Sequence, residues 1–435
     1  MKQNTPNTEL PRLSQGKLEQ VIKAHQYFVW GRRGGKRAIL KFMDLSDLDL
    51  SGRDLSYVDF TGSKLLNANL SNGRFSGAIF YSCDLRNATL DYADFSRADF
   101  RGAIISGASI QGSDLEDADM RRGQMLKYDE LGRMIESASD RARSHGPRGV
   151  TVLSGSKMTS SNLSRIKAHG ADFSDADLSG LALREADLTD VNFEGANLSD
   201  TDLSGADLDQ ANFTHSIINS QTLSTMALDE SQRKTIADPA KAGETLAQRG
   251  QSLEELISSH KKWVKSAGKQ GQQMNISGAD MRGTADLRKT PLTAIRAKGT
   301  NFMGQDLHRA NMQSAVMDQS DFRDCDLTGA DIRGSSLKEV TFSRADLRGA
   351  KLGPLRFDSP DGKGVKIQRT NLSGSLLRYC DLTGADLSYA ILMGADLTGA
   401  NLDSCDLRHA DLTGALLEGT DLNIAVLDNT LVDSL

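Results

Sequence analysis

The sequence predicts an all-β solenoid in three blocks, in which the chain coils with a square cross-section and each turn stacks on the one before it. Two observations indicate this fold. A large apolar residue returns at every fifth position over long stretches, and the residue two places before it is usually small. A third observation agrees with them: only 5% of the 435 residues are aromatic, which is few for a conventional globular core of this size.

The first run of the repeat extends from Leu45 to Met120. Asp or Asn often stands between the small and the large residue, as in Ala93-Asp94-Phe95. Every fifth position of the run is large and apolar: Leu45, Leu50, Leu55, Phe60, Leu65, Leu70, Phe75, Phe80, Leu85, Leu90, Phe95, Phe100, Ile105, Ile110, Leu115 and Met120.

A period of five fits neither an α-helix, whose side chains repeat every 3.6 residues, nor a half-buried strand, whose side chains repeat every two. It fits a coil in which five residues form one side of a square, with the large and the small residue pointing inward. Four sides then make a turn of about 20 residues, and successive turns stack at the sheet spacing of about 4.8 Å. The core becomes a column of Leu and Phe, which explains why so few aromatic residues suffice.

The repeat is interrupted twice and changes phase each time. The second run continues from Leu163 to Leu223, and the third from Leu287 to about Leu427. We therefore expect six segments: an N-terminal segment with a capping helix (1–42), a first solenoid block (43–120), a helical insertion (121–150), a second block (151–228), a helical linker with a second capping helix (229–273) and a third block (274–435).

The third run carries the pattern in its cleanest form. Ala395-Asp396-Leu397-Thr398-Gly399 is followed directly by Ala400-Asn401-Leu402-Asp403-Ser404. These ten residues resemble the motif of the pentapeptide-repeat proteins: a small residue, Asp or Asn, Leu or Phe, and two polar residues. The resemblance extends over all three runs and implies the fold of that family, a right-handed quadrilateral β-helix. It implies little about function, because most members of the family have no known activity.

Two helical segments match each other in register. Residues 18–28 read as an amphipathic helix before the first block, and residues 253–263 read as another before the third. His25 aligns with His260 and Phe28 with Trp263, and a Gly- and Lys-rich turn follows each helix. We expect both helices to cover an exposed end of a coil, which would otherwise invite edge-to-edge pairing. The two histidines are then packing residues.

Three stretches depart from the repeat. A helix is predicted from Tyr128 to about Arg143, because the Gly146-Pro147 signal closes that segment. Residues 229–270 read as helical and polar, with Pro239 as a breaker. A short loop is predicted near residues 353–364. Excursions of this kind on a rigid scaffold are where binding residues often collect, although simple drift of the repeat would give the same pattern.

The four cysteines do not predict a metal or redox site. Cys83, Cys325, Cys380 and Cys405 each stand two residues before a repeat centre, in the small inward position. No CxxC pair is present, so we expect free, buried thiols, which a reducing compartment allows. We also find no kinase, hydrolase or nucleotide-loop signature, and a filled β-helix leaves no interior cavity for a substrate. The sequence therefore predicts neither an enzyme nor a cofactor.

The formal net charge of −6 conceals an uneven distribution. Residues 1–42 hold nine basic residues against two acidic ones. The first block, 43–120, holds six against thirteen, and the second, 151–228, holds four against eleven. Residues 287–432 are almost neutral, with seventeen against nineteen. The first two blocks are therefore strongly acidic, and the segment before them is basic.

The second block contains a candidate binding patch. When the turns stack in this way, Asp187 lies beneath Asp207, and Asp190 and Asp209 lie beside them. Like charges at that spacing cost stability, so the patch is a candidate for binding a partner, although a well-solvated acidic face is the simpler interpretation. Some family members resemble duplex DNA in width and charge and bind DNA gyrase, which keeps gyrase as an alternative partner here. The length, the interrupted phase and the nearly neutral third block depart from those proteins.

Two further surfaces are candidates for contacts. The basic cluster Arg32, Arg33, Lys36 and Arg37 is too short to predict direct nucleic-acid binding, and an intramolecular turn or an acidic partner surface fits it better. The C-terminal stretch stays apolar, and we expect it to form a symmetric homodimer through Leu422, Ile424, Val426, Leu427 and Leu431.

The start of the chain has no apolar run typical of a signal peptide, and no segment approaches the length of a membrane span. The sequence therefore predicts a cytoplasmic bacterial scaffold that binds an unidentified protein partner through rigid faces, without a membrane partner.

Overall fold

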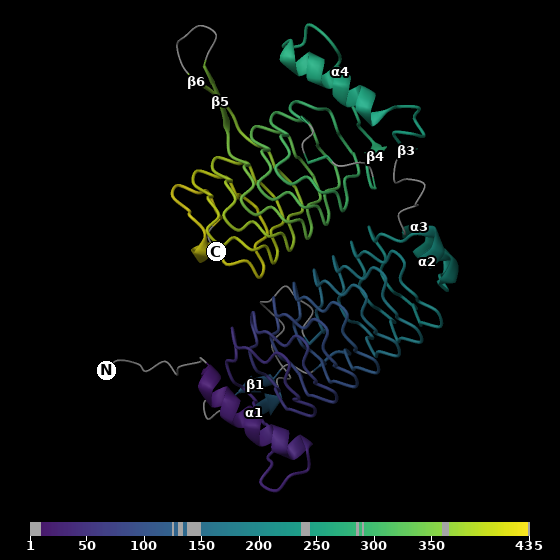
Figure 1. Ribbon diagram of the computed structural model, residues 1–435, viewed down its shortest axis with the longest axis vertical. Coiled ribbons are helices and arrows are strands. Elements are labelled where there is room, and N and C mark those ends of the chain that lie inside the picture. The colour runs from purple at the N-terminus through teal and green to yellow at the C-terminus, as the bar shows by residue number, and fades with distance from the viewer. Residues whose placement is uncertain are drawn as a thin grey trace. The chain divides into compact units, whose positions relative to one another are not determined.

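A computed structural model describes residues 10–123, 126–128, 134–136, 149–235, 244–283, 287–288, 291–358 and 365–433. The chain forms two compact units, Met1–Pro239 and Ala240–Leu435. Each unit contains one coil of stacked turns (Figure 1). The first and second predicted blocks therefore share one coil, and the third block forms the coil of the second unit.

The turns of both coils join through isolated parallel bridges between residues one turn apart. Asp54 pairs with Arg74, which in turn pairs with Asp94. In each bridge the strand geometry covers a single residue, because the chain turns a corner after every fifth residue. Few extended strands form among the described residues, and the β-helix is held by this ladder of bridges rather than by long strands.

The corners explain which residues the sequence places between repeat centres. The N–H of Ala68 donates to the carbonyl of the centre Leu65 at 3.1 Å, which closes a four-residue turn. The second residue after most centres takes positive φ, as at Gly52 (64°) and Asn67 (55°). Glycine adopts this conformation without strain and Asn with little, so the corner position favours both.

The core of each coil is the column that the period of five predicts. The ring of Phe80 stacks on Phe60 at a centroid distance of 5.1 Å and on Phe100 at 4.9 Å, each one turn away. Phe302, Phe322 and Phe342 form a similar stack in the second unit, at 4.7 and 5.2 Å. Alanines fill the small inward positions beside these rings. Each coil is thus filled by side chains throughout its length.

A helix lies at the start of each coil. In the first unit, α1 (Gln15–Val29) buries Leu18, Ile22 and His25, which are spaced to share one helix face. In the second unit, α4 (Leu253–Lys265) buries His260, and Leu253, Leu256 and Ile257 pack against the core. The amphipathic helices predicted over 18–28 and 253–263 lie within these two elements.

The first unit departs from the repeat at residues 121–150. Ile104 pairs with Val152 and Asp119 with Lys167, so the coil resumes on the turn at which it paused. Within the excursion, β1 (Leu126–Tyr128) pairs antiparallel with β2 (Met134–Glu136). The helix predicted from Tyr128 is therefore wrong for residues 128 and 134–136, and the rest of that segment lies outside the described residues.

Short elements complete both units. The first unit ends in α2 (Ser220–Thr225) and α3 (Glu230–Thr235). The helix α2, which Asn219 caps, lies within the predicted second block, so the repeat does not extend to Leu223 as predicted. The helix α3 forms part of the predicted helical linker, in which Pro239 lies outside the described residues. In the second unit, β3 (Glu244–Thr245) pairs with β4 (Ala279–Asp280). The predicted loop near residue 353 is a hairpin of β5 (Leu355–Asp358) and β6 (Val365–Gln368), which projects from the coil (Figure 1). The 3₁₀-helix η2 (Leu422–Ile424) lies in the last turn.

Candidate interaction surfaces

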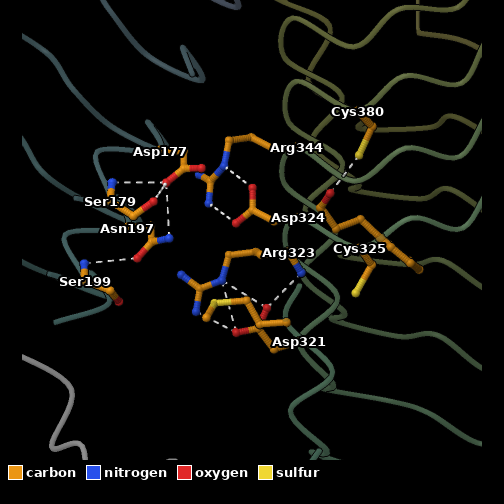
Figure 2. Close-up of polar contacts among 12 residues, drawn as sticks. Asp177, Ser179, Asn197, Ser199, Asp321, Arg323, Asp324, Cys325, Arg344 and Cys380 are labelled. Atoms are coloured by element: carbon orange, nitrogen blue, oxygen red, sulfur yellow. Dashed lines mark hydrogen bonds and ion pairs between the residues drawn. The ribbon is translucent and has the colours of Figure 1, made fainter. Parts of the chain in front are cut away.

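The outward Asp and Asn positions form columns whose side chains are fixed by local hydrogen bonds. Oδ1 of Asp177 accepts hydrogen bonds from the backbone N–H of Ser179 at 3.2 Å, from its hydroxyl at 2.8 Å and from the side-chain amide of Asn197 at 3.2 Å. Asn197 then accepts from the N–H of Ser199 at 3.2 Å (Figure 2). An Asp or Asn before a centre therefore holds its own corner and can also link to the next turn.

Arginine often neutralises these carboxylates within the same side of the coil. Arg323 forms a two-pronged ion pair with Asp321, two residues earlier (Figure 2). The hydrogen bond from Arg408 lowers the pKa of the Asp406 carboxyl. The same spacing of Asp and Arg also produces pairs at Asp84–Arg86, Asp99–Arg101, Asp119–Arg121, Asp280–Arg282, Asp331–Arg333 and Asp346–Arg348.

A second kind of pair joins corners one turn apart. Arg344 and Asp324 both have positive φ, and two guanidinium nitrogens of Arg344 lie 2.7 Å from the two carboxylate oxygens (Figure 2). Aromatic rings occupy other corners: Tyr57 lies over Gly77 in the next turn, so closely that a Cβ on that glycine would stand 2.8 Å from the ring. This pairing was not predicted, although a Tyr that precedes a corner Gly by one full turn is visible in the sequence.

The four aspartates of the predicted acidic patch lie on adjacent turns, where the N–H of Asp190 donates to the carbonyl of Asp209 at 2.8 Å, but one of them is paired with a cation. The backbones of Asp187 and Asp207 pair in a parallel β-bridge, so the two carboxylates are neighbours in one column. The hydroxyl of Thr189 donates to Asp187 at 2.7 Å, and the N–H of Asp209 donates to Asp207 at 3.1 Å. Asp190 lies at a corner, 3.7 Å from the guanidinium of Arg122. The negative charge of the patch is therefore concentrated at Asp207 and Asp209, for which no ion pair is found among the described residues.

The predicted basic cluster follows α1 as a loop. The guanidinium of Arg32 lies over the ring of Trp30, 4.8 Å from its centroid, and Arg37 donates to the carbonyl of Tyr57 at 2.5 Å. Arg33 and Lys36 are exposed. Part of the cluster thus fixes the loop to the coil, and the rest faces solvent.

The predicted dimer end divides into two groups. Leu422 is buried and Leu427 packs against the same core, so both serve the fold of the last turn. Ile424, Val426 and Leu431 are exposed, the last by 60%. Leu416, which was not predicted as part of this end, is exposed by 59%. Val426 and Leu431 take the outward position that Asp or Asn holds elsewhere.

Each buried histidine joins a helix to the first turn of its coil. Nδ1 of His25 accepts from the N–H of Ala38 at 2.9 Å, and Nε2 lies 3.1 Å from the carbonyl oxygen of Ser56. A carbonyl can only accept, so Nε2 carries the proton and the ring is neutral. Burial lowers the pKa of the imidazole, against the raising effects of the Ser56 hydrogen bond and of Asp54.

The cysteines occupy the small inward positions. The thiols of Cys83 and Cys325 each donate to a phenylalanine carbonyl at 3.0 Å, as the Ser113 hydroxyl donates to Leu90. Burial raises the pKa of Cys405 to about 12. All four thiols are unbonded to one another, and they act as small buried groups that substitute for Ser or Thr.

Within the described parts of the chain, neither a metal-binding cluster nor a membrane-spanning helix is present. No group of three or more His, Cys, Asp and Glu side chains is arranged to hold a metal ion. No helix among those residues has the length and apolar character needed to span a membrane.

Comparison with known proteins agrees with this architecture. A family model described as "Pentapeptide repeats" matches in eight copies, which together cover more than half of the chain: residues 44–80, 83–122, 151–180, 176–215, 285–324, 325–353, 366–403 and 390–429. No curated protein matches the chain.

Solved structures with similar repeats were also found. Trypsin-treated QnrB1, a plasmid-mediated fluoroquinolone resistance protein, is 21% identical over 46% of this chain and 82% of its own, with a TM-score of 0.26. HetL, a protein involved in heterocyst differentiation regulation from the cyanobacterium Nostoc, is 19% identical over 95% and 97%, with a TM-score of 0.13. A protein of the Arabidopsis thaliana thylakoid lumen is 23% identical over 34% and 66%, with a TM-score of 0.17. Likenesses this low carry no argument about function.

Proposed function

Because this chain belongs to the pentapeptide-repeat family, we propose that it is a non-enzymatic scaffold that binds a protein partner through the outward faces of its coils. The observation that carries the proposal is the column of fixed polar side chains, as at Asp187 and Asp207. These side chains are held by hydrogen bonds before any partner arrives, so binding loses little side-chain entropy. The helices α1 and α4 act as caps that keep the first turns from pairing with other chains.

Affinity capture of the full-length chain from host lysate, followed by mass spectrometry, tests the scaffold proposal. The test variant carries Asp187→Asn, Asp190→Asn, Asp207→Asn and Asp209→Asn. Asparagine keeps the acceptor oxygen of the corner hydrogen bond, so the substitutions remove charge and preserve the fold. A matched control on the second coil carries Asp306→Asn, Asp326→Asn, Asp381→Asn and Asp411→Asn. A partner retained by the wild type and control but lost from the test variant supports the proposal; equal loss from both variants contradicts the assignment to this patch.

A second candidate function is binding to DNA gyrase as a mimic of duplex DNA. The acidic excess of residues 43–120 and 151–228, which share one coil, favours this candidate. An acidic field of this kind attracts basic DNA-binding surfaces. Gyrase subunits among the captured proteins, absent with the test variant, would place this function first. Capture of one unrelated protein would support the general scaffold instead.

The exposed apolar side chains of the last turns support a homodimer as part of the same proposal. Leu416, Val426 and Leu431 would pack against their symmetry equivalents in an isologous interface. Light scattering at micromolar concentration tests this. A dimer that Leu416→Ser with Leu431→Ser converts to a monomer is the expected result, and a wild-type monomer contradicts it.

A further inference from the structure

Each capping helix ends beside an exposed basic surface. The α1 patch comprises Phe28, Trp30, Arg32, Arg33 and Lys36, and residues 30–37 hold four cations and no carboxylate. The α4 patch comprises Lys261, Lys262, Val264, Lys265 and Lys269, and residues 261–269 also hold four cations and no carboxylate. The charged side chains of both patches are exposed. The same charge therefore occurs twice, on a chain whose net charge is negative.

The positions of the packing residues repeat between the two helices, but the positions of the charges do not. His25 and His260 make equivalent contacts, and rings lie beside both: Phe28 at 5.6 Å from the first imidazole and Trp263 at 5.6 Å from the second. The cations come mainly after the helix in the first unit and mainly within it in the second. A requirement of the fold would fix positions. A requirement only for positive charge near the end of the helix would leave the positions of the cations free to differ. The two patches show this second pattern, because both hold four cations at positions that do not correspond.

Stabilisation of the helix dipole does not explain the α1 patch. Cations near a helix C-terminus interact favourably with the dipole within the last turn. Lys262 and Lys265 of α4 lie in that turn, but α1 has no basic residue in its last turn. Its cations lie in the loop beyond Trp30. The charge of the α1 patch is thus directed at something other than its own helix.

The geometry points to a polar, carboxylate-rich partner. We propose that each patch by itself is a docking surface for an acidic, extended segment of a protein partner. The guanidinium of Arg32 is held over Trp30 at 4.8 Å, which orients its N–H groups for a two-pronged hydrogen bond with a carboxylate. Trp30 is 55% exposed and offers an apolar surface beside these cations. This inference rests on the proposed scaffold function and names the chemistry of the partner.

The surroundings of the patches argue against two other anionic partners. An interfacial helix inserts an apolar face into a membrane, but the apolar faces of α1 and α4 are packed on their coils. In the α4 patch only Val264 remains as an exposed large apolar side chain. In the α1 patch Phe28 and Trp30 are exposed, but they lie at the end of the helix and not along a face of it. A long nucleic acid would run past the α1 patch onto the coil of the same unit, where acidic residues outnumber basic ones and repel phosphate. A short acidic segment needs no apolar face to insert, and it can bind a patch without extending onto the acidic coil.

Fluorescence anisotropy with a short, fluorescein-labelled poly-Glu peptide tests the proposal on the full chain. Duplex DNA and vesicles of anionic phospholipid serve as competing probes. The test variant replaces cations of both patches by an uncharged residue of similar length: Arg32→Gln, Arg33→Gln, Lys36→Gln, Lys261→Gln, Lys262→Gln and Lys265→Gln. The control variant removes the same charge from exposed lysines of the coils: Lys64→Gln, Lys157→Gln, Lys167→Gln, Lys298→Gln, Lys338→Gln and Lys351→Gln.

We expect the patch variant to bind the peptide at least about tenfold more weakly than the wild type, and the control to stay within about twofold of it. Circular dichroism verifies that both variants are folded. Equal weakening in both variants, no binding by the wild type, or tighter binding of vesicles or DNA that depends on the same residues would each overturn the proposal. The peptide needs no natural partner, so such a failure leaves the scaffold proposal standing. The capture experiment with the four aspartate substitutions tests the scaffold separately.

Discussion

The imidazoles of His25 and His260 occupy equivalent positions in the two units. Nδ1 of His260 accepts from the N–H of Met274 at 3.1 Å, and its Nε2 lies 3.0 Å from the carbonyl of Thr293. The corresponding contacts of His25 involve Ala38 and Ser56 at 2.9 and 3.1 Å. Both rings are wholly buried and neutral. One arrangement of helix, glycine turn and coil is therefore used twice in the chain.

This arrangement predicts a loss of stability in mild acid. Burial lowers the pKa of both imidazoles below the value of 6.5 that they have in the unfolded chain. The unfolded chain therefore binds protons first as the pH falls, and the stabilisation that is complete above pH 6.5 decreases below it. Near His25, Asp54 opposes the pKa shift and Arg37 adds to it.

Urea unfolding at a series of pH values between 7.5 and 5 measures this loss, because the aspartates titrate mainly at lower pH. The variant with His25→Asn and His260→Asn should be less stable than the wild type at neutral pH and should show a flatter pH dependence across this range. A wild-type stability that does not change between pH 7 and 5 would contradict the neutral, buried state of both rings.

A second prediction concerns the glycine that returns the chain onto α1. A Cβ on Gly35 would stand 2.3 Å from the backbone nitrogen of Phe28, and one on Gly271 would stand just as close to the backbone of α4. Gly35→Ala should therefore destabilise the chain by about 1–3 kcal/mol, as overpacking does. Gly16→Ala is the control: it lies in α1 with nothing within 4 Å of its Cβ, and should raise stability by up to about 1 kcal/mol. Denaturant midpoints of the two variants should move in opposite directions.

A third prediction concerns the aromatic column. Phe80 is buried between Phe60 and Phe100 and meets Phe75 and Phe95 edge-on. Phe80→Ala should cost about 3–5 kcal/mol, because it leaves a cavity in a filled core. Phe357→Ala on β5, where the ring is exposed by 44%, should change stability by less than about 0.5 kcal/mol. Similar losses from both substitutions would show that the column does not carry the stability.

The excursion of the first coil allows a prediction that depends on register. Asp84 pairs with Ile104 across an ordinary turn, whereas Ile104 pairs with Val152 across the turn that contains the excursion. The extra length of that turn equals the segment 123–150. Excision of this segment places Arg122 at the corner, Thr151 in the small position and Leu153 at the centre, in unbroken register. We expect a folded coil with a midpoint close to that of the wild type.

Excision of residues 123–149 is the matched control. It removes one residue fewer and shifts every later side chain by one position, which moves Leu153 out of the core. Thermal unfolding followed by circular dichroism should show a large loss of stability only in this second variant. Equal stability of the two excisions would mean that the bridges across the excursion do not set the register.

The repeat made much of this fold predictable, because the same positions of each five-residue unit are buried along the coil. The repeat centres from Leu45 to Met120 all point inward, and the match of His25 with His260 could be read from two aligned helices. The excursions could not be read in the same way. Residues 128–143 have helical composition, but Tyr128 and residues 134–136 belong to an antiparallel pair of strands. The sequence between these strands contains Gly132, and a glycine in a short connection favours a hairpin.

The hairpin of β5 and β6 illustrates a signal that was present but not used. Pro360-Asp361-Gly362 stands between Phe357 and Val365, and a Pro-Asp-Gly sequence between apolar residues favours a tight turn. The acidic patch was harder to predict. Sequence spacing placed Asp187 beside Asp207, but the partner of Asp190 is Arg122, which lies on the far side of an excursion whose length hid the contact.

The excursion after Met120 also has a small thermodynamic consequence for the coil. Closing a loop costs entropy that grows only with the logarithm of its length, and each doubling adds about 0.6 kcal/mol. The turn from Ile104 to Val152 is somewhat more than twice as long as its neighbours, so the excursion costs about 0.8 kcal/mol. The corner can therefore admit long excursions of very different lengths at nearly constant cost, whereas a single extra residue is too short to close into a loop of its own. Long insertions at such corners are thermodynamically inexpensive, whereas a single residue added within a side would shift all later turns.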